Sequence, residues 1–280
     1  MSDEPGGPSR VLSDVTAGYE RTEASMLLAL TDATDPALAR RYDMDAATIG
    51  EVVVTSRPGP DMAFWCQAVG FEAPPTAGLI EEIVAHFRAR DVEVARFVLP
   101  AYAETPEWPA IAEKHGLTAG ETGLKLAMRA PLPYFTPHTD LRTARIAPDE
   151  RERWATLMWG VFDMEFEANI AVTVSALDDP AFEAYACWDG DEMVATGLVW
   201  LGPDSAHLSS GATLASHRRR GAQQALLAAR VEAARRAGCS LVVNESGVAA
   251  EGYNDSARNQ IRVGFTPQYS RRTWTWTAEA

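Results

Sequence analysis

The chain has 280 residues, a formal net charge of −14 at pH 7, 46% apolar residues and 23% charged residues. This composition is typical of a globular protein with room for two domains of about 140 residues each. No apolar run approaches the roughly 20 residues that cross a bilayer, and so acidic a surface repels nucleic acid and anionic lipid. We therefore expect a cytoplasmic protein without nucleic-acid or membrane partners, either a monomer or a homodimer.

Cysteines and histidines give no sign of a disulfide framework or a metal site. Cys66, Cys187 and Cys239 are scattered, without CxxC spacing, which favours reduced, buried thiols. The five histidines do not cluster with carboxylates or cysteines at ligand spacing, so no metal is expected. The first ten residues, "MSDEPGGPSR", are predicted to be a disordered lead-in rather than a signal peptide.

The first half of the chain predicts alternating helices and strands that end in a linker. In chain order they are helices at 15–31 and 36–41, strands at 51–55 and 63–71, a helix at 77–90, a strand at 94–99, a helix at 106–115 and a strand at 124–129. The stretch "APLPYFTPHTD" at 130–140 contains three prolines and separates two periodic regions, which is typical of a linker.

The second half predicts a similar series. It has a strand at 141–146, a helix at 148–162, a hairpin with strands at 183–188 and 193–201, a strand at 206–213, a helix at 221–237, a strand at 240–245, a helix at 255–262 and a closing strand at 268–276. The hairpin follows from apolar and polar residues that alternate on both sides of "DGD".

The two halves resemble each other. "LIEEIVAHFRARDVEVARFVL" and "QALLAARVEAARRAGCSLVVN" both predict a helix, a tight turn and an apolar strand. Asp91 precedes Gly116 by 25 residues, and Gly238 precedes Gly264 by 26. Two copies of one α/β unit are the simplest explanation, which predicts domains at 11–130 and 140–280.

The stretch "SHRRRGAQQALLAARVEAARRAGC" places three arginines directly before a glycine and a helix. Residues 218–280 carry ten Arg against five Asp and Glu, whereas 140–217 carry four Arg against fourteen. The start of a helix offers unpaired N–H groups and a partial positive charge, and Gly221 allows close backbone approach. With Arg219 and Arg220 adding charged hydrogen bonds, the loop is predicted to bind a compact polyanion such as a pyrophosphate.

This loop resembles the coenzyme A loop of the Gcn5-related N-acetyltransferases (GNAT). The pattern Arg-x-x-Gly-x-(Gly/Ala) lies between a strand and a long helix, and Asn254 with the pair Gly264-Phe265 resembles the Asn and GF signature of the family. The resemblance covers 141–276, and 11–129 resembles a degenerate copy. It implies an α/β (α+β) fold of two acetyltransferase-like domains, each a mixed, mostly antiparallel sheet flanked by helices.

The resemblance also implies acetyl-CoA as cosubstrate, bound in the second domain. Backbone N–H groups of 212–214 would hold the pantetheine and polarise the thioester carbonyl, those of 219–224 would bind the pyrophosphate, and Asn254 would hydrogen-bond to the pantetheine. The implied coenzyme-binding residues are Ala212, Thr213, Leu214, Arg219, Arg220, Gly221, Ala222, Gln223, Gln224 and Asn254.

The sequence departs from the family pattern at three positions. Gln223 stands where the loop usually has Gly or Ala. Gln260 stands where the family often has a tyrosine that protonates the departing thiolate, so Tyr253 and Tyr269 are the candidate acids instead. The usual carboxylate on the fourth strand is missing. An amine nucleophile must lose a proton, so Glu245 is our first candidate base and His207 the second.

Three functions remain open at this point. The first is an acyl-CoA-dependent N-acetyltransferase that acts on a primary amine of a small molecule or peptide. The second is a non-catalytic acyl-CoA-binding sensor, and the third is a nucleic-acid-binding protein that uses the arginine-rich helix. We favour the enzyme, because a well-positioned amine attacks an activated thioester with little acid–base help.

Only the second half is expected to bind the coenzyme. "FEAPPTAGLIEEIVAHF" supplies no arginine or Gly-x-Gly turn at the corresponding helix start. Pro74 and Pro75 lack N–H donors, and Glu81 and Glu82 are predicted to place negative charge in the opening turn of that helix. One coenzyme per chain is therefore predicted, with the first half as a structural support.

Overall fold

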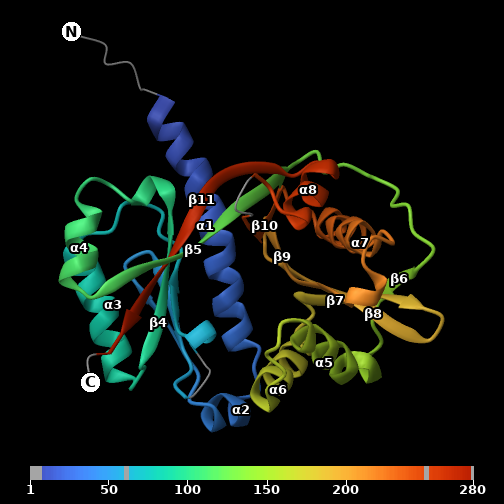
Figure 1. Ribbon diagram of the computed structural model, residues 1–280, viewed down its shortest axis with the longest axis horizontal. Helices are drawn as coiled ribbons and strands as arrows, with labels where there is room; N and C mark the ends of the chain where they lie inside the picture. Colours follow the sequence, from blue (N-terminus) through green and yellow to red (C-terminus); the bar gives the residue numbers. More distant parts are fainter. Residues whose placement is uncertain (1–7, 60–62, 249–251, 279–280) are drawn as a thin grey trace. The chain divides into compact units, whose positions relative to one another are not determined.

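The computed structural model describes residues 8–59, 63–248 and 252–278 (Figure 1). The chain forms two compact units. Unit 1 comprises Met1–Leu28, Met44–Thr122 and Ser270–Ala280, and unit 2 comprises Ala29–Asp43 and Gly123–Tyr269. Of the predicted lead-in, residues 1–7 lie outside the described residues, and 8–10 belong to the first helix. No helix in the described ranges is long and apolar enough to cross a membrane.

Unit 1 contains a mixed sheet in the order β1-β2-β3-β4-β11. The strands are β1 (Asp45–Ile49), β2 (Val52–Ser56), β3 (Gln67–Val69), β4 (Val94–Pro100) and the second part of β11 (Thr266–Thr277). The helices of unit 1 are most of α1 (Pro8–Asp32), α3 (Ala77–Ala89) and α4 (Trp108–Lys114). β3 and β4 are parallel, and the other neighbours are antiparallel. The predicted strand at 63–71 is shorter, because residues Ala63–Trp65 form a 3-10 turn.

Local sequence explains why α3 forms where it does. Thr76 is its N-cap, and the Thr76 hydroxyl accepts a hydrogen bond from the Leu79 N–H at 3.1 Å. Ile80, Ile83 and Phe87 are spaced so that they lie on one face of the helix, and all three are buried. The start of α3 is thus closed by its own cap and packed on the core of unit 1.

The strands of unit 2 are also mixed, in the order β5-β10-β9-β8-β7-β6. The strands are the second part of β5 (Leu117–Arg129), β6 (Arg142–Arg145), β7 (Phe182–Asp189), β8 (Glu192–Leu201), β9 (Ser205–Thr213) and β10 (Leu241–Gly247). The helices are α2 (Pro36–Arg41), α5 (Arg151–Val161), α6 (Glu167–Ala176), α7 (Ala222–Arg236) and α8 (Asp255–Arg262). β9 and β10 are parallel, and the other neighbours are antiparallel.

Both units therefore contain one parallel strand pair joined by a helix, β3-α3-β4 in unit 1 and β9-α7-β10 in unit 2. This shared arrangement confirms the predicted α/β fold class, since each unit has mixed, mostly antiparallel strands flanked by helices. In unit 2, α7 and α8 lie on one face of strands β7–β9, and α5 and α6 lie on the other face (Figure 1). A parallel pair leaves its strand ends and the start of the connecting helix at one edge, which is where a ligand can bind.

Two long strands, β5 and β11, each place residues in the unit that consists mainly of the other half of the sequence. Residues 123–129 of β5 pair antiparallel with β10 in unit 2. Residues 271–277 of β11 pair antiparallel with β4 in unit 1. The closing strand predicted at 268–276 is therefore present, but most of it lies in the sheet of unit 1. The domain boundaries at 11–130 and 140–280 stay a prediction.

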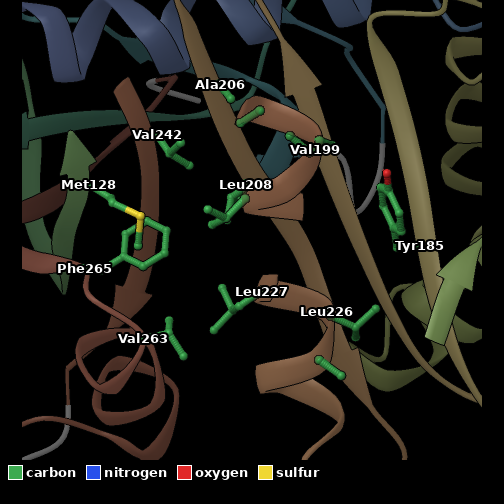
Figure 2. Close-up of a cluster of buried hydrophobic side chains, with 14 of the residues drawn as sticks. Met128, Tyr185, Val199, Ala206, Leu208, Leu226, Leu227, Val242, Val263 and Phe265 are labelled. Atoms are coloured by element: carbon green, nitrogen blue, oxygen red, sulfur yellow. The ribbon is translucent and has the colours of Figure 1, made fainter. Parts of the chain in front are cut away.

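The core of unit 2 joins α7 to the sheet. Leu226 and Leu227 of α7, Leu208 of β9 and Phe265 after α8 belong to one cluster of buried side chains (Figure 2). Alanines at 225, 233 and 234 of α7 are buried as well, so small side chains let the helix approach the strands closely. This packing holds the first turn of α7 at the end of β9.

The three cysteines are free, buried thiols, as the sequence predicts. Burial raises the pKa of the Cys66, Cys187 and Cys239 thiols above the ordinary value. A raised pKa lowers the thiolate fraction at neutral pH, so these residues behave as small apolar side chains.

Candidate functional site

The arginine-rich loop connects β9 to α7 as predicted. Residues Ala215–His217 form a 3-10 turn, Arg219 has a φ of +66°, and Gly221 has a φ of +82°. Gly221 is the N-cap of α7 and offers no side-chain hydrogen bond to the helix. The first N–H groups of α7 are consequently left open to a ligand, whereas those of α3 in unit 1 are capped by Thr76.

Gly221 is required by the chain that passes beside it. A Cβ atom at this position would lie 2.1 Å from the His138 carbonyl oxygen and 3.1 Å from the Thr139 Cβ. The Thr139 hydroxyl also donates a hydrogen bond to the Arg220 carbonyl at 2.7 Å. The sequence predicts that the missing side chain of Gly221 allows a ligand to approach, but in the structure its absence makes room for the neighbouring backbone at residues 138 and 139.

The three arginines of the loop differ in their surroundings. The Arg220 guanidinium forms ion pairs with Asp140 and, at 2.6 Å, with Asp189. Hydrogen bonds from Arg220 hold the pKa of both carboxyl groups below the usual range. Arg218 and Arg219 are exposed and line a pocket. The charge of Arg220 is thus used within the protein, and the charges of Arg218 and Arg219 face the pocket.

This pocket has a volume of about 780 Å³ and lies entirely within unit 2. Its walls come from the end of α5, from β8 and β9, from the arginine-rich loop, and from α7 and α8. Two further arginines from α8, Arg258 and Arg262, line it. Arg258 also pairs with Asp255 at 2.9 Å, and Arg262 donates a hydrogen bond to Asn259 at 2.8 Å. Arg258 and Arg262 thus border the same pocket as Arg218, Arg219 and the start of α7.

The sequence analysis missed Arg258 and Arg262. Their spacing of four places both side chains on one face of α8, and this was the signal that could have found them. Only the packing of α8 beside α7 shows that this face borders the same pocket as the arginine-rich loop.

Several predicted coenzyme-binding residues line the pocket, and others do not. Those that line it are Ala212, Thr213, Arg219, Gly221, Ala222, Gln223 and Gln224. The N–H of Leu214 donates to the Val194 carbonyl at 2.9 Å. That N–H continues the pairing of β8 with β9 and is therefore already used within the protein, and a role of Leu214 in coenzyme binding stays a prediction.

The amide of Gln223 connects two helices. Its Nε2 donates to the Ser256 hydroxyl at 2.8 Å, and its Oε1 accepts from Asn259 Nδ2 at 2.7 Å. Gln223 therefore fixes the start of α7 against α8, which explains why a larger side chain is tolerated where the family pattern has Gly or Ala.

Asn254 is the N-cap of α8. Its Oδ1 accepts from the Ala257 N–H at 2.8 Å and from the Ser246 hydroxyl at 3.0 Å. The side-chain oxygen is thus committed to the helix start and to β10. A contact of Asn254 with the pantetheine stays a prediction.

The three candidate catalytic residues lie on or next to the parallel strand pair. Glu245 is half-buried on β10, and its Oε1 occupies the space where Gly123 lacks a Cβ, since that Cβ would lie 2.3 Å away. His207 is buried on β9, paired with Val243 of β10. Tyr253 is exposed and forms a bridge with Val248 before α8. None of the three lines the pocket that the described residues form.

Another residue missed by the sequence analysis is Arg230, whose side chain lines the same pocket from the middle of α7. It is only 2% exposed. Buried charged side chains are rare without a specific reason, and a helical repeat that predicts core alanine and leucine gave no indication of this one. Among the described ranges, no group of three or more His, Cys, Asp or Glu could hold a metal ion.

Unit 2 thus combines a mixed set of strands that includes one parallel pair with an arginine-lined pocket at the start of the helix that joins this pair. Residues 144–265 match the profile of the "Acetyltransferase (GNAT) family". This segment is therefore a GNAT domain, which confirms the resemblance seen in the sequence. No curated protein matches the chain.

Solved structures with the same fold extend over nearly the whole chain. A GCN5-related N-acetyltransferase from Kribbella flavida has 19% identity and a TM-score of 0.58, and the match covers 91% of this chain and 96% of that one. A tandem GNAT protein from the clavulanic acid biosynthesis pathway has 17% identity and a TM-score of 0.54, covering 95% and 96%. A GCN5-related N-acetyltransferase from Sphaerobacter thermophilus has 15% identity and a TM-score of 0.57, covering 84% and 76%. The fold of these structures thus extends over most of this chain, and the GNAT family supports acyl-CoA-dependent acetyl transfer in general.

Proposed function

We propose that this protein is an N-acetyltransferase that moves an acetyl group from acetyl-CoA to a primary amine of a small molecule or peptide, by direct transfer in a ternary complex. The observation that supports this most is the pocket of unit 2, where the uncapped start of α7 meets Arg218, Arg219, Arg258 and Arg262. Helix N–H groups and arginines together are a strong site for a phosphate-rich ligand. We place the pyrophosphate of the coenzyme there.

In this proposal each part of the pocket has a separate task. The thioester of the cosubstrate supplies an activated acetyl group. N–H groups of the first turn of α7 and the exposed arginines bind and orient phosphate oxygens. The end of β9, at Ala212 and Thr213, lies beside the pocket and offers backbone groups for the pantetheine and the thioester carbonyl. Forming the C–N bond and breaking the C–S bond requires the amine to lose one proton and the sulfur to gain one.

A non-catalytic acyl-CoA sensor is the second candidate. It is favoured by one observation, that Glu245, His207 and Tyr253 do not line the described pocket. Release of free thiol from acetyl-CoA in the presence of a library of primary amines separates the two functions. We expect thiol release that depends on the amine. Coenzyme binding without turnover across the library would support the sensor instead.

One coenzyme is expected to bind per chain, in unit 2. In unit 1 the corresponding helix α3 is closed by Thr76 and carries no arginine at its start. Glu81 and Glu82 fall in the second turn of α3, not in the opening turn as predicted, because the helix begins at Ala77. Calorimetric titration of the whole chain with acetyl-CoA should give a stoichiometry of one. A stoichiometry of two would contradict the expectation that the first half does not bind the coenzyme.

Arg219→Ala is expected to weaken coenzyme binding about tenfold, because it removes one charged hydrogen bond from an exposed side chain that lines the pocket. Arg220→Ala is the matched control from the same loop. Its charge is already paired with Asp140 and Asp189, so we expect a change of less than about threefold. Dissociation constants from calorimetry measure both effects. An equal loss of affinity in the two variants would refute the proposal that Arg219 binds the coenzyme while Arg220 forms ion pairs within the protein.

A further inference from the structure

The Arg230 guanidinium is embedded between α7 and two strands. Its Nε donates to the Leu226 carbonyl at 3.0 Å, within α7. Its Nη1 donates to the carbonyls of Leu198 on β8 and Ser209 on β9, at 3.1 and 2.9 Å. These bonds place the guanidinium where the β8–β9 pairing shifts register, between Thr196 and Leu198. Arg230 therefore supplies hydrogen bonds to carbonyls beside this irregularity in the strand pairing.

Two glycines make room for this guanidinium and show which of its nitrogens faces the pocket. A Cβ at Gly197 would lie 2.8 Å from Cζ and 3.2 Å from Nη1. A Cβ at Gly211 would lie 4.0 Å from Nη2, and Gly211 lines the pocket whereas Gly197 does not. Nε and Nη1 therefore point to the protein backbone, and Nη2 lies on the side of the pocket.

The positive charge of Arg230 is not balanced by the protein. In the described part of the chain, no carboxylate lies within ion-pair distance of its guanidinium, and Nη2 has no hydrogen-bond partner. Burial lowers the pKa of Arg230 to about 10, so the group is still protonated at neutral pH. A cation that is largely removed from water and lacks a counter-charge is costly, and a negatively charged ligand atom at Nη2, the nitrogen that is accessible from the pocket, would lower that cost.

We propose that Arg230 Nη2 forms a carboxylate-binding subsite at the inner end of the pocket. This proposal rests on the proposed function and specifies its substrate. Arg230 lies eight residues after Ala222, which is about 12 Å along the helix from the seat of the phosphates. Val161, Phe162 and Leu226 add apolar side chains to the lining of the same pocket. Such a pocket fits a ligand that carries phosphates, an apolar part and a carboxylate.

The carboxylate can come from two sources that share this chemistry. One is the acyl group of a dicarboxylic acyl-CoA, and the other is the carboxylate of an amino-acid acceptor. A full negative charge suits the site better than a neutral carbonyl, because the hydrogen bond is then charge-assisted and the buried cation is neutralised.

Calorimetry tests both sources on the full chain. In the first arm, acetyl-CoA is compared with succinyl-CoA. In the second, amino acids are compared with the matching amino-acid amides in the presence of saturating coenzyme A. We expect at least a tenfold preference for the carboxylate-bearing ligand in one arm. Equal affinities in both arms of the wild-type protein would overturn the subsite while the proposed function stands. Failure of every coenzyme A ester to bind would overturn both.

The Arg230→Gln variant tests whether Arg230 causes the preference for the carboxylate-bearing ligand. We expect it to remove the tenfold difference, and cooperative unfolding in urea shows that the variant is folded. If Arg230→Gln does not fold, Arg230→Lys keeps the charge but loses the planar fork, and we expect it to reduce the preference. A preference that persists in a folded Arg230→Gln variant would place the carboxylate elsewhere.

Discussion

Gly221→Ala is expected to destabilise the protein by about 2–5 kcal/mol. Gly221 has a φ of +82°, a conformation that costs a residue with a Cβ about 1–2 kcal/mol. The new Cβ would also lie 2.1 Å from the His138 carbonyl oxygen, which is backbone and cannot rotate away. Overpacking of this kind costs about 1–3 kcal/mol. Urea denaturation of both proteins measures the difference in the free energy of unfolding.

Gly238→Ala is the control that separates the two causes. Gly238 ends α7 with a φ of +80°, nearly the same as Gly221, but no atom lies within 4 Å of its ideal Cβ. We expect it to show only the conformational cost of about 1–2 kcal/mol. If Gly221→Ala destabilises no more than Gly238→Ala, the contact with residue 138 does not constrain the loop, and the explanation given for this glycine is wrong.

Glu245→Gln is expected to lower turnover about 100-fold while leaving coenzyme binding unchanged, if Glu245 removes the proton from the amine. The substitution keeps the shape of the side chain beside Gly123 and removes only its basicity. His207→Ala tests the second candidate base. Steady-state rates with a reactive amine, together with the dissociation constant of acetyl-CoA, distinguish a loss of chemistry from a loss of binding.

Gly123 offers an independent test of the same residue. A Cβ at Gly123 would lie 2.3 Å from Glu245 Oε1, so Gly123→Ala must displace this flexible carboxylate at little cost to the fold. We expect Gly123→Ala to lower turnover as well. Glu232→Gln is the control, since Glu232 forms a local pair with Arg235 on α7. Wild-type rates in Glu245→Gln, Gly123→Ala and His207→Ala would leave water or a substrate group as the base.

The sequence predicted most elements because their residues repeat with a clear period. Helices α3, α7 and α8 and the hairpin β7–β8 were located within a few residues. Helix α6 and strand β1 were missed. In α6, the β-branched residues Ile170, Val172 and Thr173 disfavour a helix locally. The helix is stabilised by tertiary contacts, since Trp159 Nε1 donates to the Thr173 hydroxyl at 3.0 Å and Val172 is buried.

The sequence by itself determined the repeated α/β unit, the fold class and the place of the arginine-rich loop, because periodicity and an Arg-rich turn before a helix depend on neighbours in the chain. Only the tertiary structure decided which arginines face the pocket. Arg220 is turned away by Asp189 and Asp140, which lie 31 and 80 residues from it in sequence. Only the packing of α7 against the irregular β8–β9 pair identifies Arg230 as a candidate ligand-binding residue. Side-chain direction in a loop, and the burial of a charge, are set by long-range partners that no local pattern contains.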